Sequence, residues 1–275
     1  MPATAPSRVQ LDIANSSDVA SVLTHIRPAL VVNAAAYTKV DLAETNVEEA
    51  RRANEIGPTV LAAACVAERV PMVHVSTDCV FDGSKEGSYQ ETDLVCPVNV
   101  YGRTKAAGEQ AVRSALDRHV ILRTTWVYSE FGSNFLKTIL RLAMIRDELQ
   151  VVADQRGAPT SAREIADAIL HIAPRMIRGD DVWGTYHFTA DGITTWYEFA
   201  SRAVAIQAPL TGCNPRATAI TTADYHTAAR RPTNSRFDCR LFAKIFGISG
   251  RHWTEGVDAT TKVLVAASAQ RVHVA

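Results

Sequence analysis

Glycine is absent from the start of this 275-residue chain, where the first one is Gly57. A strand that leads into a phosphate-binding turn of the G-x-G-x-x-G type needs glycines, because the backbone must approach the phosphates closely. Residues 1–7 read MPATAPS and predict a linker rather than a buried strand. The beginning of the sequence therefore lacks the most familiar signature of a phosphate-binding turn.

Other absences limit the class of protein. The formal net charge is zero, with 29 basic and 29 acidic residues, so the composition predicts neither nucleic-acid nor membrane-surface binding. Apolar runs such as 30–36 are far shorter than the roughly 20 residues of a membrane span, and the start lacks the pattern of a signal peptide. Five cysteines without C-x-x-C spacing predict no metal site and no disulfide framework. We expect a cytoplasmic protein.

A tyrosine and a lysine four positions apart, Tyr101 and Lys105, are the strongest functional signal present. On a helix they share one face, where an ammonium favours the phenolate and lowers a phenol pKa that is ordinarily about 10. Thr77 follows the apolar run 70–75 and offers a hydroxyl to the same substrate oxygen. The alternative is a core tyrosine near a solvated lysine, and Thr77 at a strand end argues against it. The pattern predicts proton transfer to a carbonyl, which usually accompanies hydride transfer.

The order of elements predicts the fold class. Short β-like runs alternate with helical patterns, which favours an α/β fold with a Rossmann-like, doubly wound parallel sheet. The expected strands are 29–34, 72–76, 119–123 and 183–188, and the expected helices are 18–26, 47–54, 58–68, 101–116, 161–176 and 195–205. Polar residues at 33–38, 76–78 and 123–126 follow three of these strands. Because ligands bind beyond the carboxyl ends of parallel strands, we expect these residues to form one site.

The second half is less regular and predicts a smaller substrate-binding domain. We assign 1–125 to an incomplete dinucleotide-binding domain to which 145–180 return, and 126–144 and 181–275 mainly to the substrate-binding domain. Helix 195–205 contains Trp196, Tyr197 and Phe199, which we expect in the core. Residues after 209 are turn-rich. The basic cluster 230–236 is either a solvated loop or a clamp for an anionic substrate, because arginine suits bidentate phosphate contacts.

Several sequence blocks together resemble the dTDP-4-dehydrorhamnose reductase family of extended short-chain dehydrogenases/reductases. The blocks are 32–41, 75–83, 101–105, 123–128, 154–160 and 231–235, in family order over about residues 11–253. The resemblance implies reduction of the 4-keto group of dTDP-4-dehydro-6-deoxy-L-mannose by NADPH or NADH, giving dTDP-L-rhamnose. The choice between the two cofactors, a magnesium requirement and a homodimer stay open.

The resemblance also implies roles for individual residues. Tyr101 would donate the proton, Lys105 would lower its pKa and bind the ribose, and Thr77 would hold the substrate oxygen. Further positions would line the cofactor or the sugar nucleotide. Among them, Arg231 and Asn234 are argued from charge and loop position alone. The positions are Asp12, Ile13, Ala36, Tyr37 and Thr38 for the cofactor, and Asp78, Trp126, Arg231 and Asn234 for the substrate.

The chain departs from the family pattern in two ways. Cys79 stands where the family usually has a tyrosine, which alters one substrate contact. The family's first strand, glycine turn, first helix and second strand, on the order of 30 residues, have no counterpart. We expect their lack to leave central backbone groups of the sheet unpaired. Either the true start lies upstream, or this is an N-terminally truncated copy with little activity.

A different class of function also fits these departures. The same scaffold resembles the regulatory β-subunit of methionine adenosyltransferase, which is a binding partner rather than a working reductase. The retained Thr77, Tyr101 and Lys105 argue against this alternative, because a binding role does not require them. Without a phosphate cradle, we expect residues 1–275 alone to bind NAD(P)H very weakly and to show little or no reductase activity.

Overall fold

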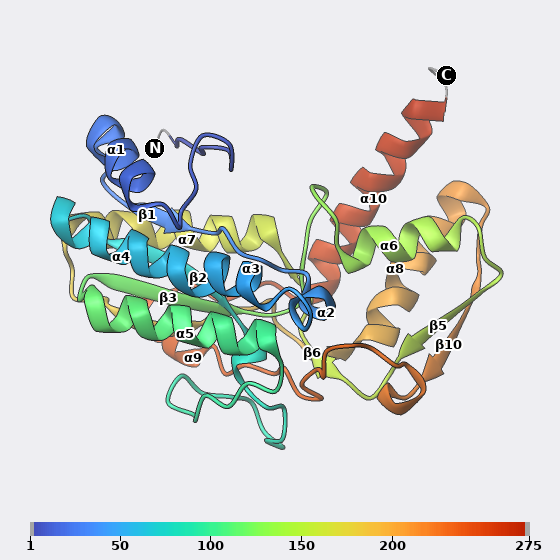
Figure 1. Cartoon of the computed structure of the whole chain (residues 1–275). Helices are drawn as coiled ribbons and strands as arrows, with labels where there is room; N and C mark the ends of the chain where they lie inside the picture. Colours follow the sequence, from blue (N-terminus) through green and yellow to red (C-terminus); the bar gives the residue numbers. More distant parts are fainter. Residues whose placement is uncertain (1–2, 273–275) are drawn as a thin grey trace.

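A four-stranded parallel sheet forms the centre of the molecule in the computed structural model, which describes residues 3–272. The sheet contains β1 (Val31–Asn33), β2 (Met72–Thr77), β3 (His119–Thr124) and β8 (Gly184–His187), in the order β1-β2-β3-β8 (Figure 1). All neighbouring strands run parallel. The predicted α/β fold with a parallel sheet is confirmed.

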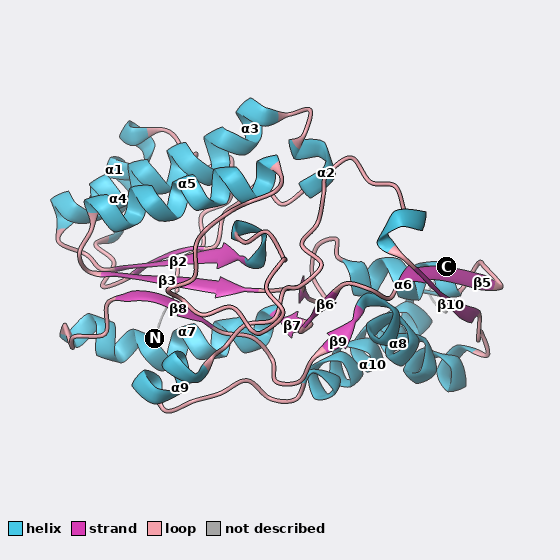
Figure 2. Cartoon of the chain, turned by 90° about the horizontal axis from the view of Figure 1, so that it is seen from below, coloured by secondary structure: helices cyan, strands magenta, loops and turns pink. Residues whose placement is uncertain are grey.

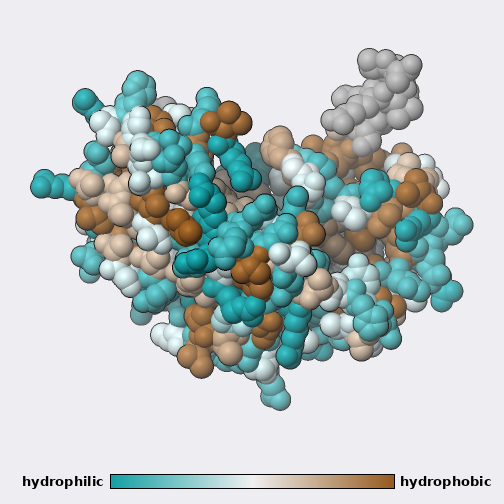
Figure 3. All heavy atoms as spheres, viewed as in Figure 1, coloured by the Kyte–Doolittle hydropathy of each residue, from teal (hydrophilic) through white to brown (hydrophobic). Residues whose placement is uncertain are grey.

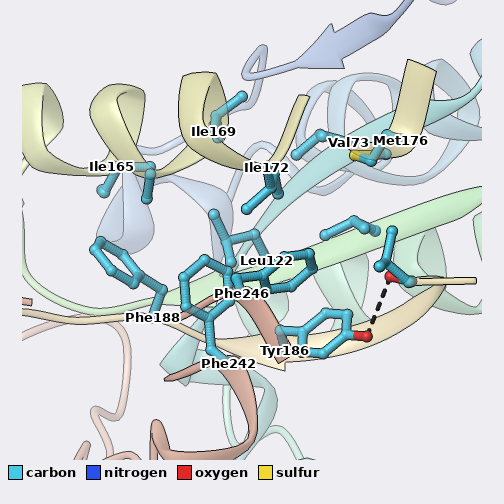
Figure 4. Close-up of a cluster of buried hydrophobic side chains, with 13 residues drawn as sticks. Val73, Leu122, Ile165, Ile169, Ile172, Met176, Tyr186, Phe188, Phe242 and Phe246 are labelled. Atoms are coloured by element: carbon cyan, nitrogen blue, oxygen red, sulfur yellow. Dashed lines mark hydrogen bonds between the residues drawn. The ribbon is translucent and has the colours of Figure 1, made fainter. Parts of the chain in front are cut away.

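Helices cover both faces of this sheet (Figure 2). One face carries α1 (Ser16–Ile26), α4 (Gly57–Glu68) and α5 (Val100–Ala115), and the other carries α7 (Ala162–Arg178) and α9 (Arg240–Phe246). Successive side chains of a strand point to opposite faces. Ile121 of β3 therefore packs under α4 and α5, whereas Leu122 joins a second core with Ile172 and Phe242 (Figure 4).

A continuous helical stretch contains the predicted helices 47–54 and 58–68. The second was expected as a separate helix or as a continuation of the first, and the structure shows the continuation. The stretch consists of α3 (Val47–Arg51), a π-helical turn (Arg52–Ile56) and α4. Pro58 is the second residue of α4, which directly follows the π-helical turn. The π-helical turn brings the Asn54 carbonyl so close to α5 that a Cβ on Gly108 would lie 2.0 Å from its oxygen. Glycine at position 108 permits this helix contact.

A second group of elements packs beside the sheet. It contains α6 (Phe135–Ala143), α8 (Trp196–Thr211), α10 (Trp253–Val272) and a parallel pair of strands, β5 (Glu148–Val152) and β10 (Arg216–Ile220). Its core includes Phe199, which is fully buried as predicted, together with Tyr128, Leu136 and Trp253. Short elements complete the chain: α2 (Val40–Ala43), β4 (Val127–Tyr128), β6 (Arg156–Gly157), β7 (Thr160–Ser161), β9 (Thr194–Thr195) and the 3₁₀ turns Asp78–Val80 and Thr222–Asp224.

Two features differ from the sequence-based predictions. The turn-rich assignment after residue 209 missed β10, α9 and α10. Residues 181–275 were assigned mainly to the substrate-binding region, yet β8 is a strand of the central sheet and α9 covers it, whereas β5 pairs with β10 outside that sheet. Apolar runs show that a segment is a strand, but not which sheet it joins.

Strand β1 forms one edge of the central sheet. It pairs with β2, and within residues 3–272 no strand pairs with its other side. Val32 is accordingly 43% exposed, which is high for an apolar residue of a parallel strand. The expected unpaired backbone therefore lies at an edge of the described sheet rather than in its middle.

The molecular surface is mixed in character. Figure 3 shows apolar and hydrophilic side chains interspersed on the face in view, so this face does not identify a partner surface. Among residues 3–272, none of the helices combines the length and the apolar character that a bilayer span requires. The homodimer stays a prediction.

Candidate active site

Tyr101 and Lys105 lie in the first turns of α5, beside the carboxyl ends of the central strands. The helix begins after Asn99, whose side chain accepts a hydrogen bond from the Gly102 N–H at 2.7 Å. Lys105 is 2% exposed, and its Nζ donates to the Val75 carbonyl oxygen at 2.7 Å. The predicted helix and the i,i+4 spacing of the pair are therefore observed.

Thr77 ends β2 and joins the same site. Its hydroxyl donates to Asp78 Oδ1 at 3.0 Å and accepts a hydrogen bond from the Cys79 N–H at 3.2 Å. Asp78 Oδ2 accepts a second hydrogen bond from the hydroxyl of Ser235. The four side chains Thr77, Asp78, Tyr101 and Ser235 are each buried. Ser235 was not singled out from the sequence.

Burial dominates the electrostatics of the catalytic pair. Burial raises the pKa of Tyr101 above its ordinary value. The Cys79 thiol raises this pKa further, whereas a hydrogen bond with Thr77 lowers it. Burial also lowers the pKa of Lys105 to about 8, against the influence of Glu109. The expected lowering of the phenol pKa by Lys105 is thus absent here. A buried lysine with a lowered pKa and a buried phenol nevertheless mark a site suited to proton transfer.

An asparagine that sequence reasoning missed holds the loop after β1. Asn54 Oδ1 accepts from the Tyr37 N–H at 2.8 Å, while Nδ2 donates to the Tyr37 carbonyl oxygen and to Thr104 Oγ1, each at 3.1 Å. Ala36 and Thr38 flank Tyr37 in this loop. Asn54 is fully buried inside a helical stretch, and a polar residue in that position is the signal that could have revealed it.

The other two residues predicted to line the cofactor lie on the N-terminal segment. Asp12 forms an exposed ion pair with Arg52 at 2.6 Å, and this hydrogen bond lowers its pKa. Ile13 packs against Gly57, where a Cβ would lie 2.5 Å from the Ile13 side chain. Both residues therefore contact the π-helical turn or the start of α4, next to Asn54.

The described residues fit one end of a dinucleotide. Among residues 3–272 the Lys105 ammonium has a single acceptor, Val75 O, so further N–H groups can bind ribose hydroxyls. Ala34 and Ala35 are exposed just beyond β1. Among residues 3–272 the first glycine is Gly57, so no glycine-rich turn precedes α4 in the described part of the chain.

Two indoles stack on each other beyond the carboxyl end of β3. Trp126 follows β3 and stacks on Trp196 of α8, with ring centroids 3.8 Å apart. Trp196 Nε1 donates to Gln155 Oε1 at 3.1 Å. A Cβ at position 157 would lie 2.6 Å from the Trp126 ring, so Gly157 is required for this approach. Trp126 was predicted as a substrate contact, whereas Trp196 was assigned to the core.

Arg231 and Asn234 have their hydrogen bonds within the chain. Arg231 makes a bidentate pair with Asp41, at 3.0 and 2.6 Å, which lowers the pKa of that carboxyl. Asn234 Nδ2 donates to the carbonyl oxygens of Lys85 and Gly87. In this arrangement both residues anchor the segment 229–236 to other parts of the chain. Their predicted contact with the sugar nucleotide stays a prediction.

The arrangement is that of known reductases. A family model described as the RmlD substrate binding domain matches residues 1–265. The chain is 44% identical over 247 residues to a curated dTDP-4-dehydrorhamnose reductase of Aggregatibacter actinomycetemcomitans, covering 89% of this chain and 84% of that protein. It is 42% identical to the Escherichia coli K12 protein of the same name, over 90% of this chain and 83% of that one.

Solved structures agree with these sequence matches. A dTDP-4-dehydrorhamnose reductase from Clostridium acetobutylicum superposes with a TM-score of 0.87 at 35% identity, covering 94% of this chain and 89% of that one. The Bacillus anthracis protein of that name, solved in complex with NADP, gives a TM-score of 0.85 at 34% identity over 93% and 88% of the two chains.

Proposed function

Because the chain belongs to the dTDP-4-dehydrorhamnose reductase family, we propose that it reduces the 4-keto group of dTDP-4-dehydro-6-deoxy-L-mannose to give dTDP-L-rhamnose. The observation that carries the proposal is the convergence of Thr77, Tyr101 and Lys105 at the carboxyl ends of the central strands. The NADP complex of the Bacillus anthracis relative supports NADPH as reductant, with NADH as the alternative. A cytoplasmic location and a homodimer are further proposals.

Each residue of the site has a defined chemical task. Tyr37, Thr38 and Lys105 would hold the nicotinamide end of the cofactor, which would supply a hydride to C4 of the sugar. Tyr101 donates its phenolic proton to O4, where negative charge would otherwise develop. The Lys105 ammonium binds the ribose hydroxyls with the N–H groups that Val75 leaves free. Thr77 and Tyr101 hold O4 in place, while Asp78 and Trp126 bind the sugar nucleotide.

An assay for reduction tests this proposal. With NADPH at millimolar concentration and the ketosugar nucleotide, we expect NADPH consumption and equimolar dTDP-L-rhamnose, identified by NMR. Sugar-nucleotide binding without reduction, combined with stoichiometric recovery of an enzyme partner, would instead favour the non-catalytic, binding-subunit role.

Cofactor affinity should be low in residues 1–275. Contacts from Tyr37, Thr38, Tyr101 and Lys105 to the nicotinamide and ribose must alone offset the loss of translational and rotational freedom, which costs several kcal/mol. We therefore expect isothermal titration calorimetry to give very weak NADPH binding. A sub-micromolar dissociation constant would show that other residues of the chain hold the pyrophosphate.

A further inference from the structure

Asn99 holds the helix turn that carries Tyr101. Asn99 is 1% exposed and directly precedes α5, in which Tyr101 is the second residue. Its Oδ1 accepts a hydrogen bond from the Gly102 N–H at 2.7 Å, and its backbone carbonyl oxygen accepts one from the Arg103 N–H at 3.0 Å. The side chain and the backbone of Asn99 therefore hold the two residues that follow Tyr101.

The amide nitrogen of Asn99 binds a distant part of the chain. Nδ2 donates to the Arg230 carbonyl oxygen at 2.7 Å, across 131 positions. That segment is itself fixed, because Arg231 makes two hydrogen bonds to Asp41 and the Ala229 N–H donates to the same carboxylate at 3.1 Å. Asn99 thus connects the first turn of α5 to a segment that is anchored on α2.

The first turn of α5 also packs directly on the turn that follows Thr77. A Cβ at position 102 would lie 2.0 Å from the Cys79 carbonyl oxygen, so the two backbones are in contact. Cys79 lies two residues after Thr77, in the 3₁₀ turn Asp78–Val80. A shift of this helix turn would therefore change the distance between Tyr101 and Thr77, the two residues that the proposed function places at O4.

We infer that Asn99 is a positioning residue for the reduction: its carboxamide caps α5 and so fixes the place of Tyr101 relative to Thr77. The inference rests on the proposed function, because it assigns a role within that site. A general acid acts only within hydrogen-bond reach of the atom that it protonates, and a displacement of about 1 Å can lower a rate about 100-fold. The contact of Nδ2 with Arg230 fixes the orientation of the carboxamide and keeps Oδ1 directed at the Gly102 N–H.

The chain offers a matched control in Asn134, the N-cap residue of α6. Asn134 Oδ1 accepts a hydrogen bond from the Lys137 N–H at 3.1 Å, and its Nδ2 donates to the Ser129 carbonyl oxygen at 2.7 Å. Asn134 therefore makes the same two kinds of hydrogen bond as Asn99, on a helix of the second group of elements. Asn99→Ala and Asn134→Ala should both lower the melting temperature, by roughly 2–4 °C.

The two alanine variants should differ in turnover. For Asn99→Ala we expect kcat for ketosugar reduction to fall about 10- to 100-fold, with little change in KM for the ketosugar, whereas Asn134→Ala should keep both values. Asn99→Ser should recover most of kcat, because a serine hydroxyl also accepts the cap hydrogen bond. Equal kcat in Asn99→Ala and Asn134→Ala, or an Asn99→Ser chain as slow as Asn99→Ala, would overturn the inference.

A second readout does not depend on turnover. NMR should show faster hydrogen exchange of the Gly102 N–H and a changed ζ-carbon signal of the Tyr101 phenol in Asn99→Ala, and neither change in Asn134→Ala. An unchanged Tyr101 signal in Asn99→Ala would likewise overturn the inference and leave the proposed function intact. Sugar-nucleotide binding without reduction in the unsubstituted chain, together with stoichiometric recovery of an enzyme partner, would instead count against the proposed function, and the NMR measurements would still test the role of Asn99.

Discussion

Replacement of Tyr101 by phenylalanine should lower kcat for ketosugar reduction by about 10³-fold, because a positioned general acid contributes about 10² to 10⁴. The substitution removes the phenolic proton that Tyr101 offers to O4 and keeps the ring. That ring packs in a small cluster with Ala43, Ala50 and Val100, so the fold and the sugar-nucleotide site should persist. Turnover at saturating NADPH and calorimetric binding of dTDP measure the two effects separately.

Tyr186→Phe provides the matched control for this loss. Tyr186 is also a buried tyrosine, but its hydroxyl donates to the Val182 carbonyl oxygen in the core between the sheet and α7, away from the site (Figure 4). The kcat of the Tyr186→Phe variant should equal that of the unsubstituted chain. Unchanged turnover in Tyr101→Phe would remove Tyr101 from the role of acid, and equal losses in both variants would point to a general effect of losing a buried hydroxyl.

Replacement of Arg123 by methionine should reduce the free energy of unfolding by about 3–5 kcal/mol, the usual cost of leaving a buried charge unpaired. Arg123 is 1% exposed and makes two hydrogen bonds to Glu109, at 2.8 and 2.6 Å. Its guanidinium also lies 5.0 Å from the centre of the Phe81 ring. Glu109 sits one turn after Lys105 on α5, so this pair fixes the catalytic helix against β3.

Arg113→Met tests whether the loss comes from the buried pair. Arg113 contacts the same carboxylate, at 3.2 Å, but its side chain is 37% exposed. Because exposed ion pairs contribute about 0–1 kcal/mol, urea unfolding should show a small change for this variant and a large one for Arg123→Met. Similar losses for the two arginines would contradict the assignment of Arg123 as the essential partner of Glu109.

Local sequence patterns predicted Thr77, Tyr101 and Lys105, because their placement depends on single helices and strands. The spacing of Tyr101 and Lys105 places both on one face of a helix whatever the rest of the chain does. Thr77 was found because an apolar run ended at it, and strand ends meet at one edge of a parallel sheet. The predicted sheet was correct for the same reason: β-like runs that alternate with helical patterns leave few other arrangements.

The missed features of the site depend on contacts between distant segments. Ser235 reaches Asp78 across 157 positions, and Arg231 reaches Asp41 across 190. In the sequence, the cluster at 230–236 shows only its charge, so a free anion clamp was the natural interpretation, whereas in the fold Asp41 neutralises Arg231. Trp196 follows an amphipathic pattern typical of core residues, and only the tertiary structure stacks it on Trp126.

Helix α10 was missed for a different reason. Its sequence from 253 to 272 is rich in alanine, valine and threonine and has no apolar stripe of helical period that would distinguish it from a loop. Its N-terminal part is nevertheless held by tertiary contacts, because Trp253 and Val257 join the core of the second group of elements. Packing rather than local pattern stabilises this helix.

Transfer of deuterium tests the central claim most directly. The chain is incubated with millimolar NADPH that carries deuterium at the transferred position of the nicotinamide, together with dTDP-4-dehydro-6-deoxy-L-mannose, and the sugar product is analysed by NMR and mass spectrometry. The account predicts dTDP-L-rhamnose with one deuterium at C4, formed at a rate that Tyr101→Phe lowers about 10³-fold. Unlabelled dTDP-L-rhamnose would contradict it.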